Sequence, residues 1–135
     1  MSEWNKKIIE EFRSNDGKVG GSFEGKSLLL LHTIGAKSGQ ERINPLATFE
    51  DGNRLVVIAS KGGAPTNPDW YYNVVANPQV EVEYKTDRFA AQAAVAEEPE
   101  RTELYARMEE IMPGFTSYKE NAARIIPVVV LTRLN

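Results

Sequence analysis

The chain has 135 residues, of which 41% are hydrophobic and 26% charged, and this composition is ordinary for a globular protein of one domain. The net charge of −3 argues against general binding of nucleic acid, and the lack of cysteine excludes disulfides, a thiol nucleophile and a thiolate metal site. No apolar run approaches the roughly 20 residues of a membrane span, and the first residues do not resemble a signal peptide. We therefore expect a single cytoplasmic domain over residues 1–135.

The first expected element is an amphipathic helix over residues 3–15. Trp4, Ile8 and Phe12 recur every four positions, and most charged residues of this segment lie elsewhere on the helix. The apolar face could pack on the body of the domain or lie on a membrane surface. Packing is favoured because the helix is short and not strongly basic, and weak association with a membrane surface stays the alternative.

Strand-like segments dominate the rest of the chain. They cover residues 27–33, 43–50, 54–60, 79–85, 88–96 and 126–132. Asp51-Gly52 predicts a tight hairpin between the second and third strands, and residues 85–88 predict another between the fourth and fifth. The last segment, IPVVVL, is continuously apolar, which predicts a central strand.

Two or three further helices are expected at the periphery. The sequence from Asn67 to Asp69 is a start signal, because Asn can cap a helix and the proline between them suits its first turn. Later helices are expected over residues 99–112 and 115–123. About six strands joined by short hairpins, with helices around them, favour a small antiparallel barrel of the mainly β, or α+β, class.

A glycine-rich loop joins the first two strands. It reads HTIGAKSGQERINPL from His32 to Leu46 and looks like a phosphate loop, but a phosphate loop of the common kind leads into a helix and this one leads into a strand. Residues 26–61 carry five basic and three acidic side chains, whereas the rest of the chain carries 11 basic and 16 acidic ones. A locally basic segment in an acidic protein indicates a small anionic ligand, and scattered surface lysines are the alternative.

Few residues suit catalysis by the protein alone. His32 is the only histidine, so we expect a structural role for it and no metal site. No G-x-S-x-G motif marks a serine nucleophile, and the chemistry is therefore expected from a bound cofactor. Lys37 and Arg42 in the first loop, and Ser60 and Lys61 in ASKGGAPTNP, could converge on its oxyanions. Taken alone, these residues are read equally well as ordinary loops.

The segments LLLLHTIGAKSGQERINPL, VVIASKGGAPTNPDWYYNVVANPQVEVE and RIIPVVVL, in this order, resemble the deazaflavin (F420)-dependent nitroreductase family. The similarity runs from about Leu28 to Leu134. Members of that family belong to the FMN-binding split β-barrel superfamily and use coenzyme F420. The resemblance implies a split antiparallel barrel and an oxidoreductase in which reduced F420 passes a hydride to an electron-poor acceptor. Quinones, nitroaromatic compounds and activated enones such as coumarin-type lactones are the acceptors implied.

The positions that match the family supply the expected site. The phosphate region would meet Ala36, Lys37, Ser38 and Arg42. The other expected cofactor-binding residues are Ile43, Asn44, Pro45, Leu46, Ala47, Ile58, Ala59, Ser60, Lys61, Asp69, Trp70, Tyr71 and Asn73. The acceptor is expected beside Ala47, Phe115 and Tyr118. Ser60 or Tyr118, or a water held by one of them, would give it a hydrogen bond or a proton, unless solvent protonates the product.

Some positions depart from the family pattern. Asn67 stands where relatives often have histidine, and Ala47 and Phe115 would make the acceptor end roomier and less polar. Arg124 matches an arginine common before the last strand, and the resemblance does not specify its role.

Alternatives accompany these expectations. Trp70, Tyr71 and Tyr118 could serve packing alone. The protein could be a non-catalytic F420 carrier, or the same barrel could hold flavin mononucleotide. Split barrels often pair, but the sequence specifies no interface, so a monomer and a homodimer are both expected possibilities.

Overall fold

The structure is a computed structural model, and it describes residues 3–23 and 25–134. The helices are α1 (Glu3–Ser14), α2 (Asp69–Ala76), α3 (Glu100–Ile111) and α4 (Gly114–Ala122), with short 3-10 turns η1 (Gly21–Phe23) and η2 (Lys61–Gly63). The strands are β1 (Leu28–Ile34), β2 (Glu41–Ala47), β3 (Phe49–Asp51), β4 (Arg54–Ile58), β5 (Gln79–Tyr84), β6 (Asp87–Val95) and β7 (Val128–Arg133).

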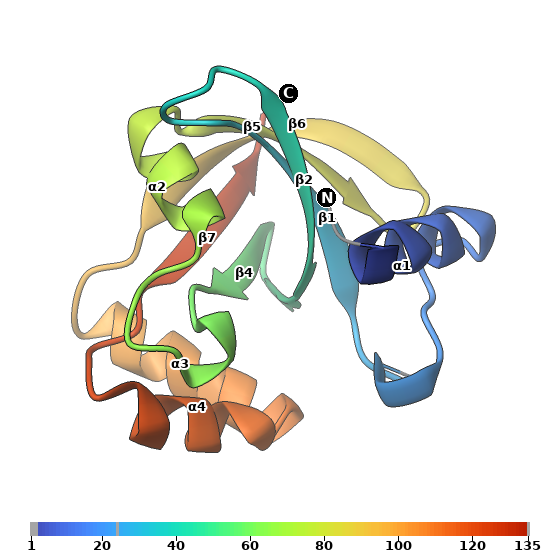
Figure 1. The fold of residues 1–135 in the computed structure, drawn as a ribbon. Coiled ribbons are helices and arrows are strands. Elements are labelled where there is room, and N and C mark those ends of the chain that lie inside the picture. The colour runs from blue at the N-terminus through green and yellow to red at the C-terminus, as the bar shows by residue number, and fades with distance from the viewer. Residues whose placement is uncertain (1–2, 24, 135) are drawn as a thin grey trace.

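All seven strands form one antiparallel sheet in the order β2-β1-β5-β6-β7-β4-β3. The sheet curls into a half-barrel, with α1 on one side, α3 and α4 together on another, and α2 beside the β1–β2 loop (Figure 1). The expected mainly antiparallel, α+β barrel is thus confirmed, with seven strands where about six were expected. The apolar strand β7 lies between β6 and β4, as its composition predicts.

The extra strand arises because the segment expected over residues 43–50 changes partners at Thr48. Before Thr48, β2 pairs with β1; after it, β3 pairs with β4. The Thr48 N–H donates to the Ser27 carbonyl at 3.1 Å, and its hydroxyl donates to the Val56 carbonyl at 2.8 Å. Thr48 therefore joins the two edges of the curled sheet, and hydrophobic pattern alone does not reveal such an exchange.

Both faces of β1, β4 and β7 are largely buried, which explains their continuous apolar sequence. Leu29 and Leu31 of β1 point into the barrel core with Trp70, whereas Leu28 and Leu30 pack against Phe12 of α1. The same alternation in β4 and β7 separates the barrel core from a second cluster under α3 and α4.

The expected start signal of α2 acts differently from its predicted role. Pro68, not Asn67, is the N-cap of α2, and no side-chain hydrogen bond caps this helix. Asn67 instead accepts a hydrogen bond from Arg124.

The first hairpin, between β3 and β4, forms as expected, but its two turn residues are Gly52 and Asn53, because Asp51 pairs with Arg54. Gly52 supplies the positive φ of 62° that this turn requires.

Helix α1 packs on the sheet, as its amphipathic pattern predicts. Ile9 and Phe12 are buried, while Trp4 is 56% exposed and contacts the Phe23 ring, so the expected apolar face is rotated away from Trp4. The helix is also held by charge, because Arg13 makes two hydrogen bonds to Glu83, at 3.1 and 2.7 Å. Hydrogen bonds from Arg13, opposed by burial and assisted by His32, lower the pKa of Glu83 to about 2.

The buried His32 completes this network. Its Nε2 lies 2.6 Å from a Glu83 oxygen, and its Nδ1 lies 3.6 Å from a Glu41 oxygen, beyond hydrogen-bond reach. His32 thus sits between a carboxylate of the core and one at the mouth of the β1–β2 loop.

Candidate functional site

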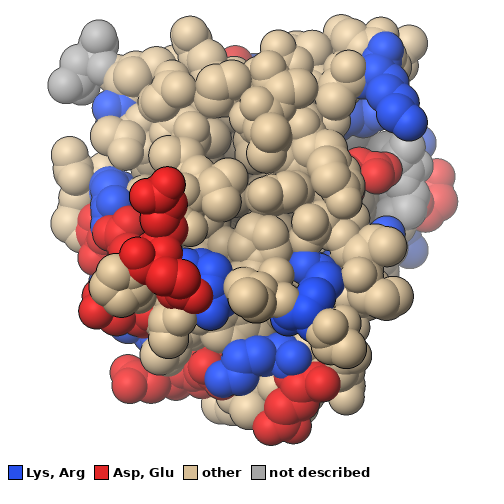
Figure 2. All heavy atoms as spheres, turned by 90° about the vertical axis from the view of Figure 1, so that its left-hand side faces the viewer, with Lys and Arg blue, Asp and Glu red and all other residues tan. Residues whose placement is uncertain are grey.

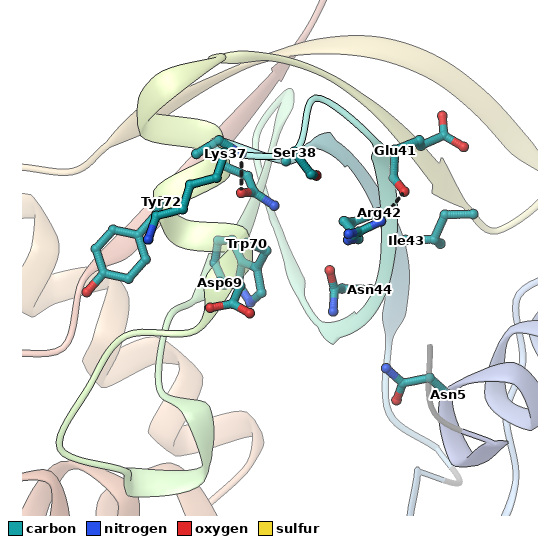
Figure 3. A pocket seen from close by; sticks show the side chains of 13 residues that line it. Asn5, Lys37, Ser38, Glu41, Arg42, Ile43, Asn44, Asp69, Trp70 and Tyr72 are labelled. Carbon is teal, nitrogen blue, oxygen red and sulfur yellow. Dashed lines mark hydrogen bonds between the residues drawn. The ribbon is translucent and has the colours of Figure 1, made fainter.

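A pocket of about 1090 Å³ lies where α1, α2, the β1–β2 loop and the start of β2 meet. Its lining residues are Asn5, Gly35, Ala36, Lys37, Ser38, Glu41, Arg42, Ile43, Asn44, Asp69, Trp70, Tyr72 and Asn73. Figure 3 shows Asp69, Trp70 and Tyr72 of α2 on one side and Arg42, Ile43 and Asn44 of β2 on the other, with Asn5 at the margin. The volume slightly exceeds the usual range of about 300–1,000 Å³ for small-molecule sites.

The β1–β2 loop is closed by its own hydrogen bonds. The Gly35 N–H donates to the Gln40 carbonyl at 2.7 Å, and the Gly39 N–H donates to the Gly35 carbonyl at 3.0 Å. The Ser38 hydroxyl accepts the Gln40 N–H at 3.2 Å, so this expected phosphate ligand also shapes the loop. A Cβ atom at Gly35 would lie 2.4 Å from the Ser38 hydroxyl oxygen, which makes glycine the fitting residue there.

Helix α2 anchors this loop through Asn73. The buried Asn73 side chain accepts the Ala36 N–H at 2.9 Å and donates to the Thr33 hydroxyl at 3.0 Å. Both polar ends of the amide are therefore engaged, one by the loop and one by β1. The position of the loop depends on the position of α2.

The pocket lining carries two cations, Lys37 and Arg42, and two carboxylates, Glu41 and Asp69. No ion pair within 4.0 Å joins these cations to a carboxylate among the described residues. One guanidinium nitrogen of Arg42, Nη1, donates to the Gln40 side-chain oxygen at 3.1 Å and to the Glu41 carbonyl at 3.4 Å. Lys37 and the rest of the Arg42 guanidinium are thus available to an anion.

Beyond the pocket, the barrel is split between β2 and β4. The two strands lie next to each other but do not pair, so one backbone edge of β2 has no partner strand in the described part of the chain. Such an edge presents N–H and C=O groups from alternate residues. Ala47, at the far end of β2, belongs to the same hydrophobic cluster as Ile58, Phe115 and Tyr118.

The acceptor residues expected from sequence therefore converge. Phe115 is only 8% exposed and makes edge contacts with Tyr105 and Tyr118, at centroid distances of 6.3 and 5.1 Å. Tyr118 is less buried than Phe115. Phe115 thus backs this end of the split, and Tyr118 is the more accessible ring.

The segment after β4 packs against α4, the helix that carries Phe115 and Tyr118. Gly63 lies so close to α4 that an added Cβ would meet Tyr118 Cα at 3.2 Å. Lys61 donates from its amine to the Thr66 hydroxyl at 3.2 Å and does not line the pocket with Lys37 and Arg42. The three cations expected to share one corner are therefore divided between two places.

Nine of the expected cofactor residues line the pocket: Ala36, Lys37, Ser38, Arg42, Ile43, Asn44, Asp69, Trp70 and Asn73. Expected residues outside its lining are Pro45, Leu46, Ala47, Ile58, Ala59, Ser60, Lys61, Tyr71, Phe115 and Tyr118. Trp70 also packs in the barrel core, and the half-buried Tyr71 packs against that core.

Four lining residues were not expected from the sequence: Asn5, Gly35, Glu41 and Tyr72. Helical spacing could have found Tyr72, because it follows Asp69 by three positions and Tyr71 does not share that face. No local signal marks Asn5, which α1 brings from the start of the chain.

The sequence profile described as F420H(2)-dependent quinone reductase matches residues 4–133. The chain belongs to the F420H(2)-dependent quinone reductase family. The family resemblance found in the sequence is thereby confirmed.

Individual proteins and solved structures similar to this chain are consistent with this family. F420H(2)-dependent quinone reductase Rv1261c of Mycobacterium tuberculosis (strain ATCC 25618 / H37Rv) is 39% identical over 126 residues, covering 90% of this chain and 85% of that protein. A solved structure of an F420-H2 dependent reductase (FDR-A) is 36% identical, with a TM-score of 0.71 over 77% of this chain and 92% of that chain. Another, described as a domain-swapped dimer, is 34% identical, with a TM-score of 0.73 over 93% and 92%.

Membership of this family implies F420 as the cofactor, and the comparisons do not support flavin mononucleotide. Within the described part of the chain, no helix is long and apolar enough to cross a membrane.

Proposed function

We propose that this member of the F420H(2)-dependent quinone reductase family is a reductase that transfers a hydride from reduced F420 to a quinone. One observation supports it above the others: a pocket lies beside the edge of β2 that no described strand pairs with, and its two cations make no ion pair within the described residues. The chain also matches the family over residues 4–133.

The residues of the pocket fit an anionic, elongated cofactor. Lys37 and Arg42 have N–H donors to spare, and each charged hydrogen bond contributes about 1.5–3 kcal/mol. The loop that carries them is already closed by backbone bonds and by Asn73, so little ordering is needed on binding. These residues would hold the phosphate region, and Ile43, Asn44 and Trp70 would flank the part that enters the split.

When bound, reduced F420 supplies the hydride. The protein positions the acceptor and excludes water from it. Ser60 and Tyr118 are suited to donate a hydrogen bond to an acceptor oxygen. Ser60 as a residue is 7% exposed, and its hydroxyl makes no hydrogen bond among the described residues. Tyr118 lies on α4 beside Gly63, close to the segment that carries Ser60.

The acceptor end favours flat, weakly polar molecules. Ala47 leaves room, and Phe115 and Tyr118 offer aromatic surface. Quinones fit this description best, and nitroaromatic compounds and activated enones are further candidate acceptors.

Competitive titration with oxidised F420 and flavin mononucleotide is the first test, and we expect F420 to bind more tightly. Stopped-flow oxidation of bound reduced F420 by menadione is the second. We expect it to be faster than oxidation of free reduced F420. Tight binding without acceleration would make the protein a carrier, and failure to bind F420 would end the proposal.

A further inference from the structure

Arg124, in the connection between α4 and β7, is surrounded by the segment that follows β4. Its Nε donates to the Ala64 carbonyl at 3.1 Å. Its Nη2 lies 2.9, 3.2 and 3.3 Å from the carbonyls of Thr66, Ala59 and Ser60, and its Nη1 donates to the Asn67 side-chain oxygen. Residues 59–67 therefore wrap around one guanidinium.

All these acceptors are neutral oxygens. No carboxylate lies within 4.0 Å of Arg124 in the described residues, so its charge is balanced by carbonyl dipoles alone. By contrast, Arg13 is matched by the carboxylate of Glu83 at 2.7 Å. This arrangement specifies the direction of several peptide groups at once.

The consequence follows from peptide geometry. In a trans peptide the C=O and the next N–H point in opposite directions. Because the Ala59 and Ser60 carbonyls turn toward Arg124, the N–H groups of Ser60 and Lys61 turn away from it. Neither N–H has a backbone acceptor within the described ranges, whereas the Ala59 N–H donates to Pro127.

We propose that Arg124 is a positioning residue, which sets the peptide groups of residues 59–67 so that the Ser60 and Lys61 N–H groups form a donor pair for an oxygen of the bound cofactor. This inference rests on the proposed function. It assigns a role to the arginine that the family resemblance left open, and it explains the use of Asn67 as an acceptor in place of a helix cap. Lysine cannot replace Arg124, because its single nitrogen cannot reach five acceptors arranged around a planar fork.

The test compares Arg124→Lys with Arg101→Lys as a matched control. Arg101 also donates to a backbone carbonyl before β7, that of Ile126 at 3.1 Å, but none of its bonds reaches residues 59–67. Calorimetric titration with oxidised F420, below the unfolding temperature of each variant, measures binding without turnover. We expect about 10-fold weaker binding for Arg124→Lys, which keeps the charge, and a change of less than about 2-fold for Arg101→Lys.

A spectroscopic signature separates positioning from general stability. Donors to a ring oxygen polarise the chromophore, so the absorption shift of oxidised F420 on binding should shrink in Arg124→Lys and persist in Arg101→Lys. Wild-type affinity and an unchanged shift in Arg124→Lys would overturn the inference while leaving the proposed function standing. If wild-type protein does not bind F420, both fall together.

Asn67→Ala covers the case in which Arg124→Lys does not fold. It removes one acceptor and leaves the other four in place. We expect binding about 3-fold weaker, in line with the loss of one hydrogen bond. Unchanged affinity and an unchanged absorption shift in a folded Asn67→Ala would count against the inference.

Discussion

The Asn73 side chain accepts a hydrogen bond from the Ala36 N–H at 2.9 Å, and so couples a helix to the loop proposed to grip the cofactor. The same amide donates to Thr33 at 3.0 Å. The loop is thus tied to α2 on one side and continues into β1 on the other. The shape of this loop therefore depends on Asn73, which lies more than thirty positions further along the chain.

Asn73→Ala should lower both stability and cofactor affinity. It leaves the Ala36 N–H and the Thr33 hydroxyl without their partner, at a cost of about 1–3 kcal/mol in the free energy of unfolding. Denaturant unfolding and F420 titration measure the two effects. Asn77→Ala, in the exposed C-cap of the same helix, is the control and should change affinity little. Equal affinity in the Asn73 variant would show that the loop holds its shape without α2.

Lys37→Ala and Arg42→Ala should each weaken F420 binding by roughly 10-fold, because each removes one charged hydrogen bond. Binding should weaken with salt in the wild type and less steeply in the double variant. Lys18→Ala removes an exposed lysine that does not line the pocket and should bind as wild type does. Unchanged affinity in the double variant would place the anionic part of the cofactor elsewhere.

Tyr118→Phe should slow quinone reduction and leave cofactor affinity unchanged. The variant keeps the ring contact with Phe115 at 5.1 Å and loses only the hydroxyl. Loss of one neutral hydrogen bond corresponds to roughly 3- to 10-fold in kcat/KM for menadione. Tyr72→Phe, at the pocket wall, is the matched control and should keep the wild-type rate. A Tyr118 variant as fast as wild type would leave Ser60 or solvent as the donor.

The Arg13–Glu83 pair should make the docking of α1 sensitive to acid. The pKa of Glu83 is lowered from 4.5 to about 2 in the folded protein, so its stabilising effect is complete above pH 4.5 and is lost as pH falls toward 2. Because Arg13 is half exposed, we expect this effect to be about 2 kcal/mol, below the full value for such a shift.

Unfolding measured across that range should show the loss in wild type and a weaker dependence in Glu83→Gln. The control is Glu81→Gln, on the same strand as Glu83, which breaks the exposed ion pair between Glu81 and Arg88 of β6. It should lower the free energy of unfolding by less than about 0.5 kcal/mol. Parallel pH curves for wild type and Glu83→Gln would contradict the assignment.

Alanine substitutions at the neighbouring Gly62 and Gly63 distinguish the cost of backbone strain from the cost of steric crowding. Gly62 and Gly63 both have positive φ, 65° and 88°. An added Cβ meets nothing within 4 Å at Gly62 but lies 3.2 Å from Tyr118 Cα at Gly63. Gly62→Ala should cost about 1 kcal/mol, and Gly63→Ala clearly more, with slower quinone reduction as the segment shifts from α4. Equal unfolding free energies for the two would mean that the contact with Tyr118 adjusts freely.

The fold follows in large part from local pattern. The alternation and hairpin signals place the six expected strand segments within a few residues, and prolines and turn residues place the helix ends. What these signals miss is the change of partner at Thr48, because a strand that moves from β1 to β4 keeps an unbroken strand-like sequence. The rotated face of α1 is missed for a similar reason, since Trp4 meets Phe23 only through tertiary packing.

The family and its cofactor class were inferred from the resemblance of three ordered segments to a known family, because the residues of these segments taken alone fit ordinary loops equally well. Which groups of these segments meet was decided by tertiary structure alone. Long-range hydrogen bonds bring Ala36 to Asn73 and residues 59–67 around Arg124, while Lys61 turns to Thr66 and away from the other cations. A linear sequence lists donors and acceptors, but only the folded chain brings them within the roughly 3 Å that a hydrogen bond requires.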